Sequence, residues 1–402
     1  MKLIRNIPAY VWTILALVLG ITLGGFFSQT LEPVASGTTA FIKFIVYIVP
    51  VLIFAALSPA FAVLVKRGLA GKFAVSVILW FVLTSTIAAF FGLVISSLVF
   101  SIPFSTMATG VLNEIVKMFD VFLEKGGASL PLIAIFAAVI IGLLSVRIRF
   151  LFSFLSKIQE TINKAGQTLG LILVPIIFCL GITLGVKFGA KLGMEHFLTI
   201  TLYTFLLCTA WSIFYILVII KLIAKRNLKS LMTQYYIPTA VFAAGTVSSL
   251  ATFPVNITNI KKYGVRPEIA DFVISFGAVT NMNGSALINI AFAPFILHYI
   301  FGIDISLTMM LFALPAIVVF TIAAPGLPAG MGTALWTSTL FASMLGLEEP
   351  VRSTLITTWV ALYGGLPDMF ITAVNCTGDG FSAVLFDSFF SRFSKAETKK
   401  MK

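Results

Sequence analysis

Long apolar runs constrain the fold of this chain more than any other feature of its sequence. About twenty consecutive apolar residues are enough for a helix to cross the hydrocarbon core of a bilayer. Eight such windows, some interrupted or overlong, lie at residues 8–28, 39–64, 73–102, 107–146, 165–190, 197–224, 267–301 and 350–391. The sequence therefore predicts an all-α polytopic membrane protein with eight transmembrane helices.

The composition excludes a soluble fold. Of the 402 residues, 59% are hydrophobic and 10% charged, whereas about a quarter of the residues are charged in an ordinary soluble domain. The net charge is +12, but the basic residues stand in small groups between apolar runs, so we expect the lipid bilayer as a partner and no nucleic acid. The sequence also lacks the phosphate-binding loop of an ATP-driven pump.

Two further apolar segments, 229–262 and 306–345, are interrupted by Gly, Pro, Ser and Thr. Irregular backbone is tolerated at membrane depth only where protein or a water-filled cavity covers it. We therefore expect two re-entrant helical hairpins. With eight spans, the main groups of Lys and Arg fall on one side, which places both termini in the cytoplasm of a multi-pass inner (plasma) membrane protein. The hairpins then enter from opposite sides, as in transporters with inverted repeats.

Polar residues form one face of the last apolar window. Asp368, Thr372, Asn375 and Asp379 follow at offsets of 0, 4, 7 and 11 residues, which is helical spacing. Carboxylates at this depth are costly unless they are paired or hydrated. The stripe therefore favours a cation site, the alternative being protonated carboxyl groups that hold helices together.

The seventh window contains Gly277 and then the run Asn281-Met282-Asn283-Gly284-Ser285. Gly and Asn in mid-helix indicate an unwound turn whose carbonyl oxygens can coordinate Na⁺, although a Gly/Ser packing interface is the alternative. Helix breakers also stand at the middle of both hairpin segments, around Ser248-Ser249 and Gly326-Leu327-Pro328. A half-helix that begins at such a tip offers free N–H groups to a substrate carboxylate.

These motifs together resemble the dicarboxylate/amino acid:cation symporter family, which has the glutamate-transporter fold. The run 281–285 resembles the family's Asn-Met-Asp-Gly-Thr signature, Ser248-Ser249 its serine-rich first hairpin, and residues 326–328 the tip of its second hairpin. The stripe from Asp368 to Asp379 is similar to its final helix, and Thr84-Ser85 to a pair that lines a sodium site.

The resemblance implies a homotrimer that works as an elevator-type transporter. Residues 1–70 and 104–192 would form a fixed scaffold that includes the trimer contacts. Residues 71–103 and 193–393 would form the moving transport domain, and 394–402 a cytoplasmic tail.

The resemblance also implies roles for single residues. Asp368 would bind the ammonium group of an amino acid substrate, Ser249 and Asn375 its α-carboxylate, and Ser285 and Thr372 would line the side-chain end, with Ser248 and Gly326 at the hairpin tips. The principal sodium site would consist of Gly277, Asn281, Asn375 and Asp379. Na⁺ is thus the expected coupling ion, and no other cofactor is expected.

Two departures from the family pattern bear on selectivity and coupling. Ile371 stands where dicarboxylate-selective members carry an arginine, so we expect small neutral amino acids, unless Lys43 or Arg266 reaches the site and restores acidic selectivity. Asn283 replaces the Asp of the signature, so a second sodium site at Thr84, Ser85 and Asn283 lacks its charge. We therefore expect transport to be coupled to fewer sodium ions than in typical members of the family, with proton-coupled or uncoupled transport as the alternative.

Two other classes of protein also place polar residues in a membrane. An intramembrane aspartyl protease needs two carboxyl groups that share a proton, whereas Asp368 and Asp379 lie about 16 Å apart along one helix. A channel would suit the polar stripe but does not need hairpins from both sides. The sequence therefore favours a secondary transporter, which is not an enzyme.

Overall fold

The computed structural model describes residues 9–41, 72–101, 147–323 and 331–400, together with residues 44, 51, 54, 58, 137, 138, 140–142, 144 and 145. Its regular structure is helical throughout this part of the chain. Five helices are long and apolar enough to cross a membrane: Val75–Val99, Val174–Lys191, Gly193–Ala224, Ile269–Ile300 and Leu366–Phe389. The predicted spans 39–64 and 107–146 lie mostly outside the described residues.

The N-terminal helix α1 (Ala9–Phe26) packs extensively against α7 (Arg149–Tyr215). Gly189 interrupts α7 with φ 76° and ψ 163°, a conformation that glycine adopts without a steric penalty. This kink separates the predicted spans 165–190 and 197–224. The π-helix η2 (Ile216–Ala224) then extends the second limb to the predicted end, and α3 (Lys72–Val99) corresponds to the third span.

The first predicted hairpin is present as two helical arms. One arm runs from α8 (Leu228–Leu231) through η3 (Met232–Tyr236) into α9 (Ile237–Thr246), and the other is α10 (Ser249–Tyr263). Val247 between them is left-handed, with φ 48°. Ser248 then caps α10, since its side-chain oxygen accepts a hydrogen bond from the Ala251 N–H at 3.3 Å.

The seventh span is broken where the sequence predicts an unwound turn. Helix α11 (Pro267–Thr280) ends before Asn281 and Met282, and α12 (Asn283–Ala293) and η4 (Pro294–Ile300) follow. The second hairpin has arms α13 (Leu307–Ala323) and α14 (Met331–Met344). Its tip, including Gly326, lies outside the described residues.

The last predicted window, 350–391, is divided rather than continuous. Helix α15 (Val351–Tyr363) ends at Gly364, and α16 (Leu366–Lys400) begins after Gly365. Pro367 in the first turn of α16 explains the break, because proline has no N–H with which to continue the hydrogen bonding of α15.

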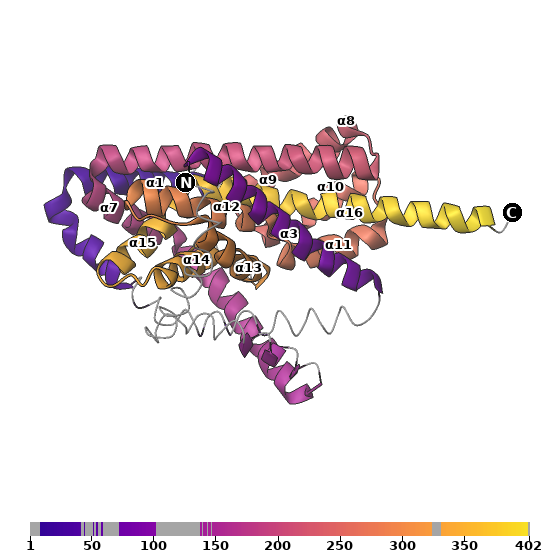
Figure 1. Ribbon diagram of the computed structural model, residues 1–402, viewed down its shortest axis with the longest axis horizontal. Helices are drawn as coiled ribbons and strands as arrows, with labels where there is room; N and C mark the ends of the chain where they lie inside the picture. Colours follow the sequence, from indigo (N-terminus) through magenta and orange to yellow (C-terminus); the bar gives the residue numbers. More distant parts are fainter. Residues whose placement is uncertain are drawn as a thin grey trace, which may run out of the picture.

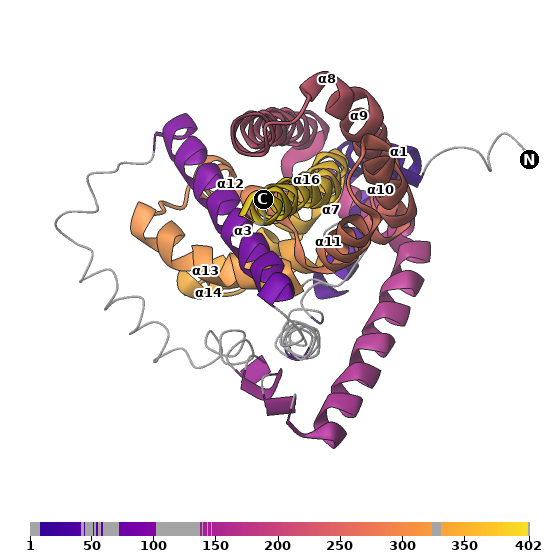
Figure 2. The same cartoon turned by 90° about the vertical axis from the view of Figure 1, so that its right-hand side faces the viewer.

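Helix α16 occupies the middle of the bundle. Figure 1 shows it running from the centre toward the C-terminus, and the end-on view in Figure 2 shows α3, α10, α11 and α12 arranged around it. The open end of the first hairpin lies near α8 and α11 at the right of Figure 1, whereas α15, which follows the second hairpin, lies at the left. The open ends of the two hairpins therefore lie toward opposite ends of the bundle.

Candidate functional site

The polar stripe of α16 is buried at the centre of this arrangement. Asp368, Thr372, Asn375 and Asp379 are each at most 6% exposed. Helix α16 contacts α9 and α10 of the first hairpin and also α11 and α12. Among the described residues no Lys or Arg forms an ion pair with either carboxylate. Both acids therefore lie buried without a cationic partner.

Asp379 meets the unwound turn of the seventh span. Its Oδ1 accepts a hydrogen bond from Asn281 Nδ2 at 2.9 Å. Gly277 lies against the same carboxylate, and a Cβ at this position would overlap the carboxylate oxygen. Three of the four predicted sodium residues, Gly277, Asn281 and Asp379, are thus adjacent in space, although about 100 residues separate Asp379 from the other two in the sequence.

These residues suit a sodium ion. Alkali cations prefer oxygen ligands, and the Asp379 carboxylate is buried beside the Asn281 side chain, whose Oδ1 is buried without a hydrogen-bond partner. A rotation of the Asn281 amide would bring this oxygen to the carboxylate in place of Nδ2. The cluster would then offer a cation one charge and at least one neutral oxygen.

Two residues of the first hairpin complete the surroundings of Asp379. Asn256 Nδ2 lies 3.4 Å from Asp379 Oδ2 and donates to the Cys376 carbonyl oxygen at 2.8 Å. The Tyr235 hydroxyl donates to Asn256 Oδ1 at 2.9 Å. Neither residue was among the predicted site residues, although an Asn between Val255 and Ile257 was a usable signal.

Asn375, the fourth predicted sodium residue, binds the signature run instead of Asp379. Its Oδ1 accepts hydrogen bonds from the N–H groups of Gly284 at 2.8 Å and Ser285 at 3.3 Å, and its Nδ2 donates to Ser285 Oγ at 3.1 Å. Asn375 therefore satisfies N–H groups that would otherwise be free at the start of α12. It also fixes the Ser285 hydroxyl beside the stripe.

Asp368 stands at the other end of the stripe with an unused acceptor. Its Oδ2 is buried and has no hydrogen-bond partner. Tyr363 lies five residues earlier, and its hydroxyl is 3.4 Å from both Thr333 Oγ1 on α14 and Asn289 Nδ2 on α12. A buried carboxylate oxygen without a partner is costly, so this position favours a ligand that donates hydrogen bonds, such as an ammonium group.

The second candidate cation site contains only neutral groups. Ser85 Oγ donates to Asn283 Oδ1 at 2.9 Å, and Asn283 Nδ2 is buried without a partner. The Thr84 hydroxyl donates within its own helix, to the Trp80 and Phe81 carbonyl oxygens. The structure thus brings Ser85 and Asn283 together but gives them no charge.

The remaining predicted substrate residues lie around the same stripe. Ser249 Oγ is 3.7 Å from Cys376 Sγ, which places the tip of the first hairpin against α16, and Ser248 caps α10. Ile371 is fully buried, and its carbonyl oxygen would lie 2.6 Å from a Cβ added at Gly284. The position of the missing arginine is therefore packed against α12.

The alternative that Arg266 reaches the substrate site and restores acidic selectivity is wrong. Its Nε donates to Asp387 Oδ1 at 2.6 Å, and its Nη2 donates to the Asp387 carbonyl oxygen at 2.9 Å. Asp387 lies nineteen residues beyond Asp368 on α16, or about 28 Å along the helix axis. The other candidate, Lys43, lies outside the described residues.

A broken seventh span, two hairpins and buried carboxylates on the central helix are the features of a polytopic membrane transporter. The profile of the sodium:dicarboxylate symporter family matches residues 9–389, and the chain belongs to this family. It is therefore a membrane-embedded transporter and not an enzyme, which excludes the protease alternative.

Two relatives show the range within this family. Over 151 residues the chain is 31% identical to Neutral amino acid transporter B(0) of Mus musculus, a match that covers 37% of this chain and 26% of that protein. Over 189 residues it is 27% identical to Proton/sodium-glutamate symport protein of Bacillus subtilis (strain 168), covering 46% and 42%. The matches thus span well under half the length of these relatives.

Proposed function

We propose that this protein imports a small neutral amino acid by sodium-coupled, elevator-type alternating access. The observation that carries the proposal is the buried α16 stripe, which has an unpaired carboxylate oxygen at Asp368 and a second carboxylate beside the Asn281 turn. An α-amino acid supplies an ammonium group for Asp368. Na⁺ supplies the positive charge that balances the buried Asp379 carboxylate.

The preference for a neutral side chain rests on Ile371 and Arg266. Ile371 is apolar and packed against α12, and Arg266 is bound to Asp387. Burying a second carboxylate without a partner costs several kcal/mol, which corresponds to a loss of roughly a hundredfold in affinity. The neutral amino acid transporter among the relatives is consistent with this choice, and an acidic substrate, as for the glutamate symporter, is the alternative.

Sodium coupling is proposed to act through Asp379, Asn281 and Gly277, with Asn375 linking this cluster to Ser285. Substrate affinity should rise with sodium concentration, and substrate must then tighten sodium binding by the same factor. The neutral pair of Ser85 and Asn283 favours fewer sodium ions than a site with the signature Asp would bind. A proton-coupled or uncoupled transporter is the second candidate, because the Ser85–Asn283 pair is neutral and gives a second sodium ion no charge to bind.

The assembly and topology follow from the family resemblance and the charge distribution. We propose a homotrimer whose scaffold comprises 1–70 and 104–192 and whose moving domain comprises 71–103 and 193–393. Both termini would lie in the cytoplasm of the inner (plasma) membrane, with 394–402 as a tail. Size-exclusion chromatography with light scattering in detergent should give the mass of three chains.

Uptake into proteoliposomes tests the proposed function. Labelled serine should accumulate when an inward sodium gradient is imposed and should not when choline replaces sodium. Asp368→Asn should abolish uptake because it removes the charge that binds the ammonium group, while trimer mass and melting temperature stay near those of the wild type. Unchanged affinity in this variant, or stronger competition by aspartate than by serine, would contradict the substrate assignment.

A further inference from the structure

A cavity of about 460 Å³, lined by apolar as well as polar side chains, lies outside the α16 stripe. Its walls come from the helical segment 28–41, from residues 183–187 of α7 and from the first two turns of α15. None of the residues of the α16 stripe lines this cavity, so it is separate from the site described above. Small-molecule sites commonly have volumes of about 300–1,000 Å³.

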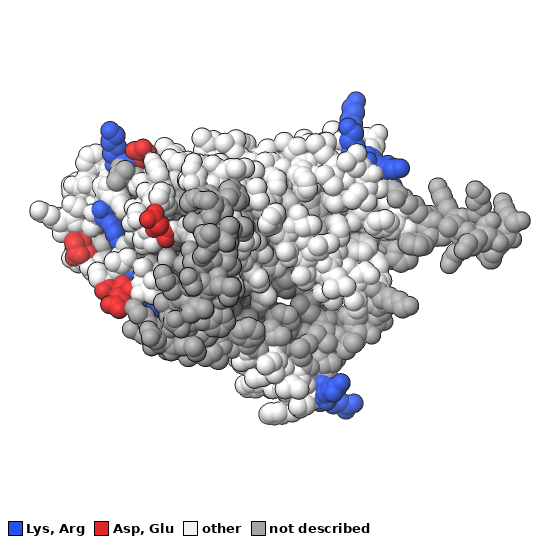
Figure 3. Space-filling model, viewed as in Figure 1, with Lys and Arg blue, Asp and Glu red and all other residues white. Residues whose placement is uncertain are grey.

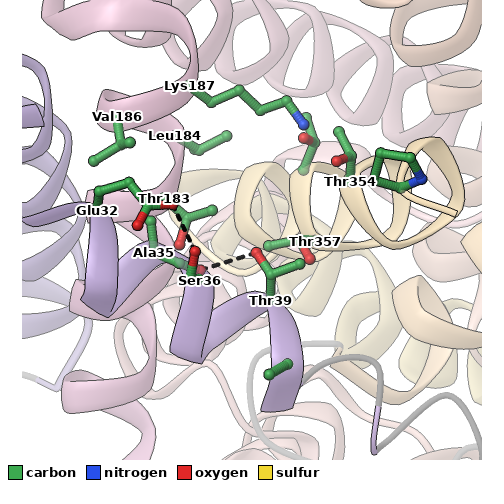
Figure 4. A pocket seen from close by; sticks show the side chains of 13 residues that line it. Glu32, Ala35, Ser36, Thr39, Thr183, Leu184, Val186, Lys187, Thr354 and Thr357 are labelled. Carbon is green, nitrogen blue, oxygen red and sulfur yellow. Dashed lines mark hydrogen bonds between the residues drawn. The ribbon is translucent and has the colours of Figure 1, made fainter. Parts of the chain in front are cut away.

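One positive and one negative side chain face this cavity from different elements. Figure 4 shows Lys187 reaching from α7 toward α15, while Glu32 and Ser36 project from segment 28–41 on the other side. Glu32 Oε1 accepts a hydrogen bond from Ser36 Oγ at 2.6 Å. Neither Lys187 nor Glu32 has an ion-pair partner within the described part of the chain. The Lys187 ammonium group also lies 5.9 and 5.8 Å from the ring centroids of Phe188 and Phe301. No opposite charge among the described residues neutralises Lys187 or Glu32, so both charges remain available to a ligand.

Hydroxyl groups line the space between the two charges. Thr354 and Thr358 lie one turn apart on α15, and for the part of the chain that is described neither hydroxyl has a hydrogen-bond partner. Thr183 and Thr357 donate to carbonyl oxygens of their own helices at 2.9 and 2.7 Å, which leaves their oxygens able to accept. The cavity thus combines donors and acceptors with one charge of each sign.

We propose that this cavity binds a small zwitterion, with its anionic group at Lys187 and the unpaired threonine hydroxyls and its ammonium group at Glu32. A simple anion would be repelled by Glu32, and a simple cation by Lys187. Two sources carry this chemistry: a free amino acid, or the headgroup of a phosphatidylethanolamine lipid. The binding site is additional to the proposed transport site and does not depend on it.

Equilibrium binding of labelled serine and labelled phosphoethanolamine to purified protein tests this proposal. Wild-type protein should bind serine in two saturable components per protomer. Lys187→Met and Glu32→Gln should each remove one component or weaken it at least tenfold. Lys191→Met is the matched control, because this exposed lysine lies four residues further along α7, beyond the Gly189 kink, and does not line the cavity.

The variant Asp368→Asn separates this proposal from the proposed function. It should remove the serine-binding component that belongs to the proposed transport site. The double variant Asp368→Asn with Lys187→Met should then bind no serine. Two components in Asp368→Asn and one in Lys187→Met would contradict the proposed transport site but support the cavity. Phosphoethanolamine binding that depends on Lys187 and Glu32, without serine binding there, would identify a lipid headgroup as the source. Retention of both serine components and of phosphoethanolamine binding in Lys187→Met and Glu32→Gln would overturn the proposal.

Discussion

Asp379 is surrounded by amide groups rather than by basic side chains, and this distinction governs its chemistry. Asn281 and Asn256 place N–H groups near its two oxygens at 2.9 and 3.4 Å. Amides orient a carboxylate but do not neutralise it, so the charge remains available for a cation. Asn256 is in turn held by Tyr235, whose hydroxyl oxygen also lies 3.0 Å from the Thr377 carbonyl oxygen.

Asn256→Ala should therefore weaken sodium binding without removing the sodium ligands. A hydrogen bond to a charged group contributes about 1.5–3 kcal/mol. We therefore expect the sodium concentration that gives half-maximal uptake to rise about tenfold or more. Asn259→Ala is the control, because Asn259 lies one turn away on α10 and donates to Thr239 at 3.1 Å. Equal effects of the two variants would mean that Asn256 only stabilises the hairpin.

Asn283→Asp should restore a charge to the second candidate cation site. The new carboxylate would be fully buried next to Ser85, and its attraction for a cation in a partly dehydrated site amounts to several kcal/mol. Uptake should then depend more steeply on sodium, with half-maximal rate at about tenfold lower concentration. Adding Ser85→Ala should reverse part of this gain, and an unchanged sodium dependence in Asn283→Asp would show that residues 84, 85 and 283 form no cation site.

At the scale of helices, glycines set how closely α1 approaches α7. A Cβ at Gly181 would lie 2.6 Å from the Leu17 carbonyl oxygen, and a Cβ at Gly20 would lie 2.9 Å from the Ile182 nitrogen. In membranes such small-residue contacts let two backbones pack directly, because burial in lipid provides little hydrophobic attraction between helices. This contact joins the two parts of the proposed scaffold, 1–70 and 104–192.

Gly181→Ala should consequently lower the melting temperature of the purified protein by several degrees, because overpacking of a tight contact costs about 1–3 kcal/mol. The matched variant is Gly37→Ala, which also lies in a helix but has open space around it. Alanine is the better helix former by about 1 kcal/mol, so Gly37→Ala should be neutral or stabilising. A Gly181→Ala protein as stable as Gly37→Ala would show that the close approach is not required.

At the scale of the whole molecule, charge differs between the two ends. The acidic side chains visible in Figure 3 gather at one end, where basic ones also occur, whereas the end from which α16 leads to the C-terminus shows basic side chains only. Arg226 and Arg266 both bind Asp387 near that end, joining η2, α11 and α16. By the positive-inside rule, this end is the proposed cytoplasmic side.

Cysteine labelling in a background without Cys179, Cys208 and Cys376 tests this topology. A membrane-impermeant maleimide should label Glu348→Cys in intact cells, because the loop before α15 is exposed and lies on the proposed outer side. It should label Ser394→Cys only after the cells are permeabilised. The reverse pattern would invert the proposed orientation and exchange the sides from which the two hairpins enter.

The features that could be predicted from the sequence are those that depend on neighbours in the chain. Helical spacing places Asp368, Thr372, Asn375 and Asp379 on one face, and all four are buried. Helix breakers within the apolar windows predicted the unwound turn at Asn281 and the break before Ser249. These inferences succeeded because periodicity and backbone preferences act over a few residues, which a single sequence displays directly.

Contacts between residues that are far apart in the sequence could not be predicted and become visible in the folded chain. Asn256 lies more than 120 residues from Asp379 and yet approaches its carboxylate, whereas Arg266, a candidate for the substrate site, binds Asp387 instead. Asn375, predicted to contact both substrate and sodium, uses its amide to cap α12. The physical reason is that such pairings are set by the packing of broken helices against α16, and their geometry leaves no periodic trace in the sequence.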